Sequence, residues 1–365
     1  MPVFSAQKSG QANLPLHYGQ APPWLFQRMV NLSKQITLAI VDEYGPEEML
    51  HRISHPCWFQ ALGCVLGFDW HSSGVTTTVC GAIKAGINGI EKDLGFFAAG
   101  SKGGTSRRTP SELTNWGQVL SLDSAPQIYA SRMSAKVDSA AIQDGYQLYH
   151  HAFFFTNSGS WVVVQQGMNK NTHYARRYHW LGEKVQDFVN EPHSGVSSQA
   201  KSIALDLAAE QSANARKTIA DIACHEKPGT LLAQLKRLST LTLTARHDLR
   251  PSDMCMDSLQ KILLRAHEQQ PANFEQLLGL HGVGPKTIRA LSLISEIIHG
   301  VAPAYRDPAR YSFAHGGKDG IPYPIDRSTY DESIEYLARM LQKTYLEKAE
   351  KQAATMRLDK LRADN

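Results

Sequence analysis

Side chains suited to metal-assisted chemistry follow one apolar run and interrupt another in the first half of the chain. Asp69 and His71 come just after an apolar run that ends at Gly67, and Asp144 precedes an aromatic run with two His and two Gln. Side chains two positions apart on a strand share one face, so Asp69 and His71 can point into the same site. Carboxylate oxygen and imidazole nitrogen are ligands for manganese, for magnesium with water, or for zinc. We therefore predict a divalent-metal site, manganese or magnesium, with Asp69, His71 and Asp144 as ligands.

The aromatic run adds candidates but limits how many of them can share that site. His150 and His151 lie in its first half, and Gln165 and Gln166 in its second. Adjacent residues of a strand face opposite sides, so only one His and one Gln can point into a single pocket. The predicted catalytic residues are Asp69, His71, Asp144, His150, His151 and Gln166.

The residues around Asp69 also have a purely structural interpretation. Ser72 or Ser73 can cap the helix that follows, and Asp69 can order the loop before it. In that case the polar cluster orders the backbone and does not bind a metal.

A second stretch, residues 282–287 with the sequence GVGPKT, has the residue types of a phosphate-binding turn. Glycine leaves no Cβ in the way of an anion, proline suits the first turn of a helix, and that amide end attracts negative charge. Placed between two apolar helical segments, the stretch resembles the helix-hairpin-helix motif of DNA repair and recombination proteins. The resemblance implies backbone binding without base reading, by Gly282, Val283, Gly284, Lys286 and Thr287. The alternative is an ordinary helical turn with glycine at a C-cap.

The same motif is similar to that of DNA glycosylases, which implies a different chemistry. Lys286 stands where the bifunctional members carry a nucleophilic lysine, and Asp326 resembles their catalytic aspartate. The interval between the two is about twice that of the glycosylases. The implied reaction is attack of an amine on a sugar carbon, assisted by a carboxylate.

Three other basic stretches are predicted to contact DNA. Residues 97–110 are expected to form a flexible basic loop, residues 170–180 interleave arginine with aromatic side chains, and residues 301–330 form a long basic and aromatic loop. Cationic side chains beside aromatic planes can bind phosphates and stack bases, although such segments are often simply solvated. The residues predicted for DNA are Lys102, Arg107, Arg108, Arg176, Arg177, Arg306 and Arg310.

The elements that must position these residues indicate an α+β fold. Residues 145–169 contain two strand-like runs around Asn157-Ser158-Gly159-Ser160 and predict a β-hairpin or small mixed sheet. Helical periodicity dominates residues 202–267 and continues through residues 274–299. We predict an α/β domain over residues 1–195, an all-α DNA-binding domain over residues 196–345 and a charged helix over residues 346–365.

Composition agrees with a soluble, cytoplasmic protein. The 365 residues are 42% hydrophobic and 20% charged, with a net charge of +4 that permits nucleic-acid binding without predicting it. The five cysteines never occur in CxxC spacing, so neither a disulfide framework nor a zinc ribbon is indicated. No apolar run approaches a membrane span, so we expect no membrane partner.

Longer stretches of rare residues resemble a bacterial and archaeal family catalogued as domain of unknown function 763. They include Asn13-Leu14-Pro15-Leu16-His17-Tyr18-Gly19, Phe68-Asp69-Trp70-His71-Ser72-Ser73-Gly74 and Val164-Gln165-Gln166-Gly167-Met168-Asn169. The leading prediction is a metal-dependent DNA nuclease of repair or recombination that binds the duplex backbone, with single-stranded or junction DNA as further substrates. A glycosylase or abasic-site lyase using Lys286 and Asp326 is the first alternative. The second is a DNA-binding adaptor for repair proteins that cuts nothing, and the sequence leaves oligomerisation open.

Overall fold

The computed structural model describes residues 23–67, 74–172, 174–198, 203–239, 256–309, 327–344 and 347–363, except for the side chains at 327–331, 333 and 360–363. Four residues with predicted roles, Asp69, His71, Arg310 and Asp326, lie outside these ranges. None of the described helices combines the length and the apolar composition needed to cross a membrane.

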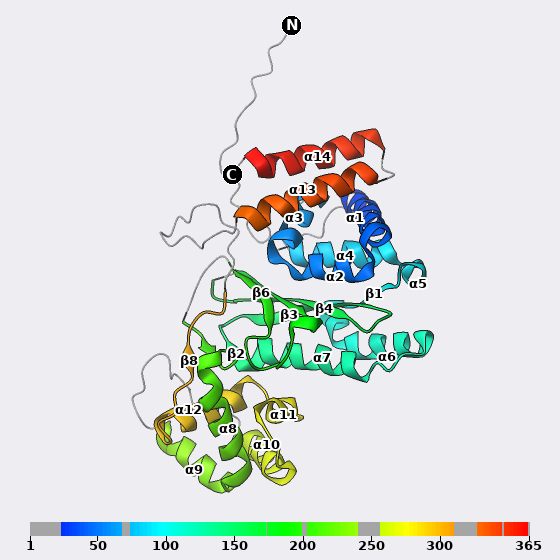
Figure 1. Ribbon diagram of the computed structural model, residues 1–365. Coiled ribbons are helices and arrows are strands. Elements are labelled where there is room, and N and C mark those ends of the chain that lie inside the picture. Colours follow the sequence, from blue (N-terminus) through cyan, green and yellow to red (C-terminus); the bar gives the residue numbers. More distant parts are fainter. Residues whose placement is uncertain are drawn as a thin grey trace.

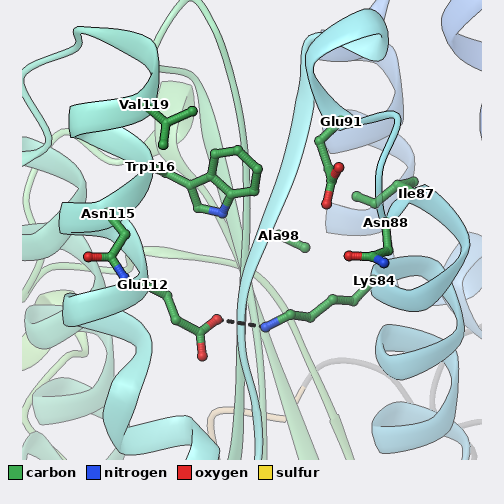
Figure 2. Close-up of a pocket in the computed structure, with 9 residues that line it drawn as sticks. All are labelled: Lys84, Ile87, Asn88, Glu91, Ala98, Glu112, Asn115, Trp116 and Val119. Atoms are coloured by element: carbon green, nitrogen blue, oxygen red, sulfur yellow. Dashed lines mark hydrogen bonds and ion pairs between the residues drawn. The ribbon is translucent and has the colours of Figure 1, made fainter.

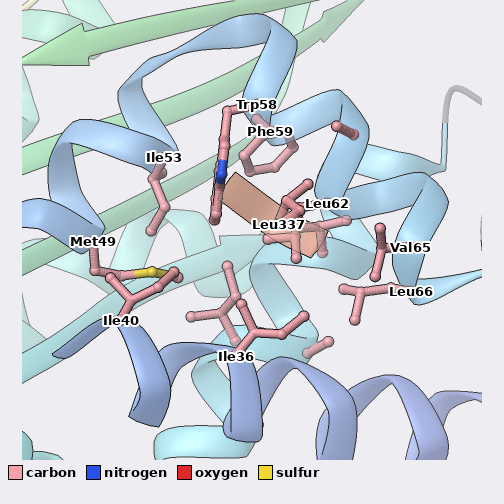
Figure 3. Close-up of a cluster of buried hydrophobic side chains, with 14 of the residues drawn as sticks. Ile36, Ile40, Met49, Ile53, Trp58, Phe59, Leu62, Val65, Leu66 and Leu337 are labelled. Carbon is pink, nitrogen blue, oxygen red and sulfur yellow. The ribbon is translucent and has the colours of Figure 1, made fainter. Parts of the chain in front are cut away.

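One layer consists of helices from both ends of the chain (Figure 1). It contains α1 (Pro23–Tyr44), α2 (Pro46–Ser54), α3 (Pro56–Leu66), α4 (Val75–Ile87), α5 (Glu91–Leu94), α13 (Arg327–Lys343) and α14 (Lys348–Ala363). Proline opens both α2 and α3, where its missing N–H costs nothing. Every residue of α3 is buried, because α3 packs between α13, α14 and the helices before and after it (Figure 3).

The middle layer is a five-stranded antiparallel sheet. Its order is β1 (Phe96–Lys102), β3 (Gln147–Thr156), β4 (Trp161–Met168), β5 (Ala175–Leu181) and β6 (His193–Ser198). The predicted hairpin is confirmed, since β3 pairs with β4 from Phe155↔Trp161 to Gln147↔Met168, with a register shift between Leu148 and His150. Side chains alternate between two cores: Phe154 and Val162 face the α3 layer, whereas Phe153 and Val163 face the other side. With both faces covered, the strands bury polar residues of β5 as well as the apolar ones of β3 and β4.

The remaining elements cover the second face and extend from it. They are η1 (Gly103–Arg108), α6 (Thr109–Leu120), α7 (Ala125–Lys136), the π-helical η2 (Val137–Ala141), η3 (Gly182–Lys184), η4 (Glu210–Ser212), α8 (Ala213–His225), α9 (Pro228–Leu238), α10 (Met256–Gln269), α11 (Phe274–Gly279) and α12 (Pro285–Ile297). A second antiparallel sheet joins β2 (Ile142–Gln143), β7 (Leu205–Asp206) and β8 (Ala304–Tyr305). One hydrophobic cluster runs from the sheet through α7 to α12.

The structure confirms a mixed α+β fold with antiparallel sheets. It corrects two local expectations. Residues 97–102, predicted as part of a flexible loop, belong to the edge strand β1, and the first five residues of β1 are buried. Residues 175–180, part of the stretch predicted to contact DNA, belong to β5 (Ala175–Leu181), of which all but Ala175 are buried. In both cases burial between two helical layers outweighs the local polarity of the sequence. The second sheet joins residues on both sides of position 195, and the division into domains stays a prediction.

Candidate functional site

The helices α11 and α12 meet at a short turn, residues 280–284. Asn273 caps α11 by accepting a hydrogen bond from Gln276 N–H at 2.9 Å, while the Gln276 side chain accepts one from Ala272 N–H. Leu277, Val283 and Ile288 are buried and fasten the two helices to one core. The turn is therefore held from behind by its apolar side chains.

Some backbone amide groups at the turn have no hydrogen-bond partner within the described ranges. Gly282 has φ +91°, a left-handed conformation that favours glycine. Among the described residues, the N–H groups of Gly282, Gly284 and Thr287 have no hydrogen-bond partner. Gly284 caps α12 in an extended conformation without a side-chain cap, and Lys286 is exposed in the first turn of α12. Amides at a helix N-terminus beside a cation attract anions, and of these three residues Gly282 is exposed, Gly284 is half-buried and Thr287 is buried.

Three side chains from other elements bind carbonyl groups of this turn and of Pro285, the first residue of α12. Lys136, at the end of α7, donates from Nζ to the carbonyl oxygens of Val283 and Leu280. Gln143 in β2 donates to Pro285 O at 2.9 Å, and Arg265 in α10 donates to His281 O at 2.6 Å. Burial lowers the pKa of Lys136. Side chains from three other elements thus hold the carbonyl groups in place.

A buried polar network starts two residues after Lys136, in the π-helical turn η2. Asp138 is fully buried and accepts hydrogen bonds from Gln165 Nε2 at 2.5 Å, Trp180 Nε1 at 3.0 Å and His193 Nε2 at 2.6 Å. Three donors and full burial make Asp138 a fixed acceptor. A π-helical turn is rare and frequently marks a functional site.

The network assigns the tautomers of two histidines. His151 Nδ1 donates to Gln165 Oε1 at 2.9 Å, so its Nε2 accepts from Ser131 Oγ at 2.9 Å. Burial lowers the pKa of His151 and keeps its ring neutral. His193 carries its proton on Nε2, toward Asp138, and its Nδ1 makes no hydrogen bond to any described residue. A buried carboxylate that holds one imidazole nitrogen as a donor leaves the other nitrogen as a base.

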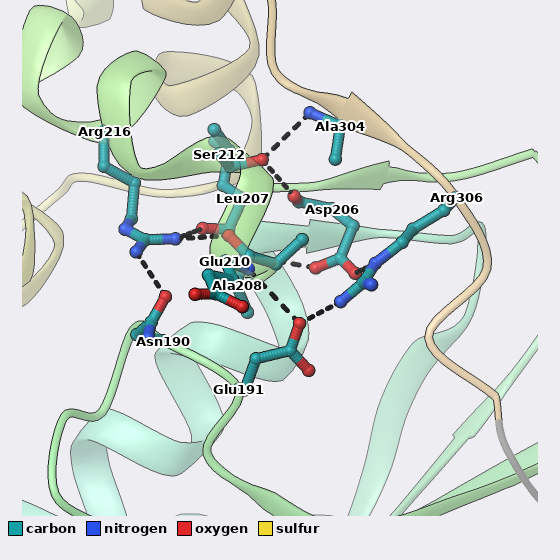
Figure 4. A network of polar contacts seen from close by, with 11 residues as sticks. Asn190, Glu191, Asp206, Leu207, Ala208, Glu210, Ser212, Arg216, Ala304 and Arg306 are labelled. Carbon is teal, nitrogen blue, oxygen red and sulfur yellow. Dashed lines mark hydrogen bonds and ion pairs between the residues drawn. The ribbon is translucent and has the colours of Figure 1, made fainter.

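His193 lines a cavity of about 80 Å³. The other lining residues are Glu191, Gly195, Val196, Asp206, Arg306, Asp307 and Pro308. Arg306 bridges two of the carboxylates, with its Nε at 3.2 Å from Asp206 Oδ2 and its Nη2 bound to Glu191 (Figure 4). Burial raises the pKa of Asp206. The cavity thus combines an oriented base, a buried carboxyl and a cation, and it has room for a few water molecules.

The segment that carries Glu191 is held in a strained conformation. Glu191 has φ +47°, which is uncommon for a residue with a Cβ. Arg216 in α8 fixes this segment by donating to Asn190 Oδ1 at 2.6 Å and to the carbonyls of Leu207 and Ala209, as Figure 4 shows in part. Strain that the surroundings hold in place is often found beside functional sites.

The structure separates the predicted catalytic residues. Asp144 lies in an ion pair with Arg176 at 2.8 Å and accepts a hydrogen bond from Tyr178 at 2.6 Å. His150 faces the α3 layer, opposite to His151, and both of its ring nitrogens are buried with no hydrogen-bond partner among the described residues. Burial lowers the pKa of His150 to about 3. Gln166 donates to the hydroxyl of Tyr149.

The predicted metal ligands are therefore not seen together. Asp69 and His71 lie outside the described residues, and Asp144 is occupied by Arg176. No group of three or more His, Cys, Asp or Glu side chains in the described part of the chain is arranged to hold a metal ion.

The predicted DNA-binding residues fall into three groups. Lys102, Arg107, Arg108 and Lys286 are exposed. Arg176 and Arg177 are buried: Arg176 pairs with Asp144 and Asp307, and Arg177 donates to Gln60 Oε1. Arg306 faces the cavity. Both buried arginines are too deep in the protein to reach a DNA backbone at its surface.

Sequence reasoning missed Asp138, His193, Lys136 and Gln143. Asp138 and Lys136 occur in an ordinary helical pattern, and His193 follows Glu191-Pro192 in a segment that reads as a connector. Only the fold brings them to the turn and the cavity.

Comparison with known proteins identifies a family. The model of a family described as "Protein of unknown function (DUF763)" matches residues 10–325. The chain belongs to DUF763. No curated protein and no solved structure matches this DUF763 chain.

Proposed function

We propose that the protein binds the sugar-phosphate backbone of DNA through residues 282–287 and acts in DNA processing. The proposal rests on the N–H groups of Gly282, Gly284 and Thr287, which have no hydrogen-bond partner in the part of the chain that the structure describes, and on the exposed Lys286 beside them. A helix-hairpin-helix motif would use these groups, and the DNA-binding domain of residues 196–345 would be built around it. Exposed Lys102, Arg107 and Arg108 would extend the basic surface.

The salt dependence of DNA binding tests this proposal. Anisotropy of a short labelled duplex is measured between about 50 and 200 mM salt for the unmodified protein and for Lys286→Ala. Loss of one phosphate contact should lower the slope of log K against log salt by about 0.9. Lys92→Ala, at an exposed position in α5, is the matched control and should leave the slope unchanged. Equal slopes for all three proteins would contradict the proposal.

A second candidate function is hydrolysis of the bound DNA, the metal-dependent nuclease of the leading prediction. The observation that favours an enzyme is the pair formed by Asp138 and His193 beside the cavity. Nδ1 of His193 would take a proton from water, whose oxygen would attack phosphorus while the bond to the leaving oxygen breaks. Asp69 and His71 remain the proposed ligands for manganese or magnesium, which would neutralise the phosphate.

Incubation of labelled duplex, single-stranded, bubble and abasic DNA with manganese, magnesium or EDTA distinguishes the candidates. Cleavage that EDTA abolishes, and that His193→Gln reduces strongly, supports the nuclease. A borohydride-trapped adduct that persists in EDTA instead supports a lyase using Lys286 and Asp326. DNA binding without any product supports the adaptor.

A further inference from the structure

The edge strand β1 lies at the bottom of an open groove, far along the chain from the DNA-binding turn. The groove has a volume of about 310 Å³. Figure 2 shows β1 passing between α6, which contributes Glu112, Asn115, Trp116 and Val119, and the α4–α5 segment, which contributes Lys84, Ile87, Asn88 and Glu91. Ala98 is the strand residue that lines it.

Ala98 of β1 is 7% exposed, and its backbone directs toward the groove a hydrogen-bonding edge that is unpaired among the described residues. In an antiparallel edge strand, every second residue directs its N–H and C=O away from the neighbouring strand. Gly100 is such a residue, since its N–H donates to Glu112 Oε2 at 3.1 Å and its carbonyl accepts from Lys84 Nζ at 2.9 Å. Ala98, two positions earlier, therefore points its N–H and C=O the same way. Neither has a partner among the described residues.

The shape of the groove favours a single extended chain. Because α4 and α6 lie over opposite faces of the sheet, they flank the open edge on both sides. The ion pair between Lys84 and Glu112, at 2.6 Å, closes the edge at Gly100. The β1 edge of a second copy would carry its own α4 and α6 and could not enter. A single extended peptide, about 4.8 Å from β1, has no such obstruction.

The two walls differ in chemistry. On the α6 side, Trp116 is half-buried and Val119 is 51% exposed, so an apolar side chain would be covered there. On the other side lie Asn88 and Glu91. Lys84 and Glu112 neutralise each other, which leaves Glu91 as the uncompensated charge of the lining. Side chains of an added strand alternate between the two walls.

We propose that this groove binds an extended segment of a partner protein, with alternating apolar and basic residues, as an additional strand beside β1. The N–H and C=O of Ala98 hydrogen-bond to the segment, its apolar side chain packs on Trp116 and Val119, and its basic side chain approaches Glu91. The proposal does not depend on the DNA-binding function.

The test uses the full chain and a labelled synthetic peptide of alternating lysine and valine. Binding is measured by anisotropy, and hydrogen exchange is followed at the backbone amides of Ala98 and Ala99. The amide of Ala98 should gain protection on adding peptide, whereas that of Ala99, already directed toward β3, should not change. A peptide with N-methyl groups along one edge, and a glutamate-valine peptide, should each bind at least tenfold more weakly.

Two variants complete the test. Ala98→Pro removes the outward donor and leaves the bonds between β1 and β3 intact, so the peptide should bind at least tenfold more weakly. Val119→Lys changes only an exposed side chain and should weaken binding through lost apolar contact and repulsion, even if Ala98→Pro fails to fold. Unchanged exchange at Ala98, or equal binding of the N-methylated peptide, would overturn the proposal.

Discussion

Replacing Gly284 by serine should separate the stability of the turn at residues 280–284 from its proposed DNA binding. Gly284 is the N-cap of α12, with φ −146° and ψ −173°, a conformation open to any residue. A Cβ at this position would meet no heavy atom closer than Gly282 O at 4.0 Å. The Gly284→Ser variant should therefore fold without strain, and its hydroxyl can accept a hydrogen bond from Thr287 N–H.

The substitution should have opposite effects on the stability of the protein and on its affinity for DNA. Serine is a better N-cap than glycine by a few tenths of a kcal/mol, so the free energy of unfolding should rise slightly. A phosphate that needs the Thr287 amide would lose a hydrogen bond to a charged group, about 1.5 kcal/mol. The DNA affinity should accordingly fall about tenfold.

Urea denaturation and duplex anisotropy, run on the same preparations, measure both effects. Gly229→Ser is the matched control, because Gly229 lies in the first turn of α9 and a Cβ there meets nothing within 4 Å. The control should bind DNA like the unmodified protein. If Gly284→Ser retains full DNA affinity while its stability is unchanged or higher, the amides of this turn do not hold the phosphate.

Three further outcomes follow from burial. His150, whose pKa is lowered to about 3, should make the protein less stable as the pH falls from about 6.5 toward 3, by about 1.4 kcal/mol per pH unit, because only the unfolded chain takes up the proton. The His150→Leu variant should lack this pH-dependent loss of stability, which amounts to about 2 kcal/mol between pH 7 and pH 5 in urea titrations. Gly100→Ala should lower the free energy of unfolding by about 3 kcal/mol or more, because φ at Gly100 is +77° and a Cβ there would overlap His151 O. An unchanged urea midpoint would refute this prediction. Asp144→Asn should cost about 3 to 5 kcal/mol in thermal or urea unfolding, because the fully buried Arg176 would lose the carboxylate that lies 2.8 Å from it, whereas a loss below about 1 kcal/mol would show the pair to be dispensable.

The local pattern of the sequence was sufficient for several elements. The hairpin of β3 and β4 and the turn between α11 and α12 were predictable because the deciding residues are close together in the chain. Runs of aromatic and β-branched residues around Asn157-Ser158-Gly159-Ser160 favour two paired strands, and two glycines followed by proline end one helix and begin another.

The functional surroundings could not be predicted in the same way. The sequence pattern predicts Arg176 and Arg177 to be surface cations. Both are buried, because helices cover both faces of β5. The strand β1 reads as a loop, because its pairing partner β3 is about fifty residues away. Local polarity is a poor guide where burial depends on distant layers.

The sequence by itself determined the residue types of the turn, the α+β class and the membership of DUF763. The tertiary structure decided which side chains meet. Lys136 reaches Val283 across 147 positions, and His193 reaches Asp138 across 55. Such contacts come from the packing of whole layers, and the free energy that holds them is spread over many apolar residues far from either partner. No short motif can therefore specify them.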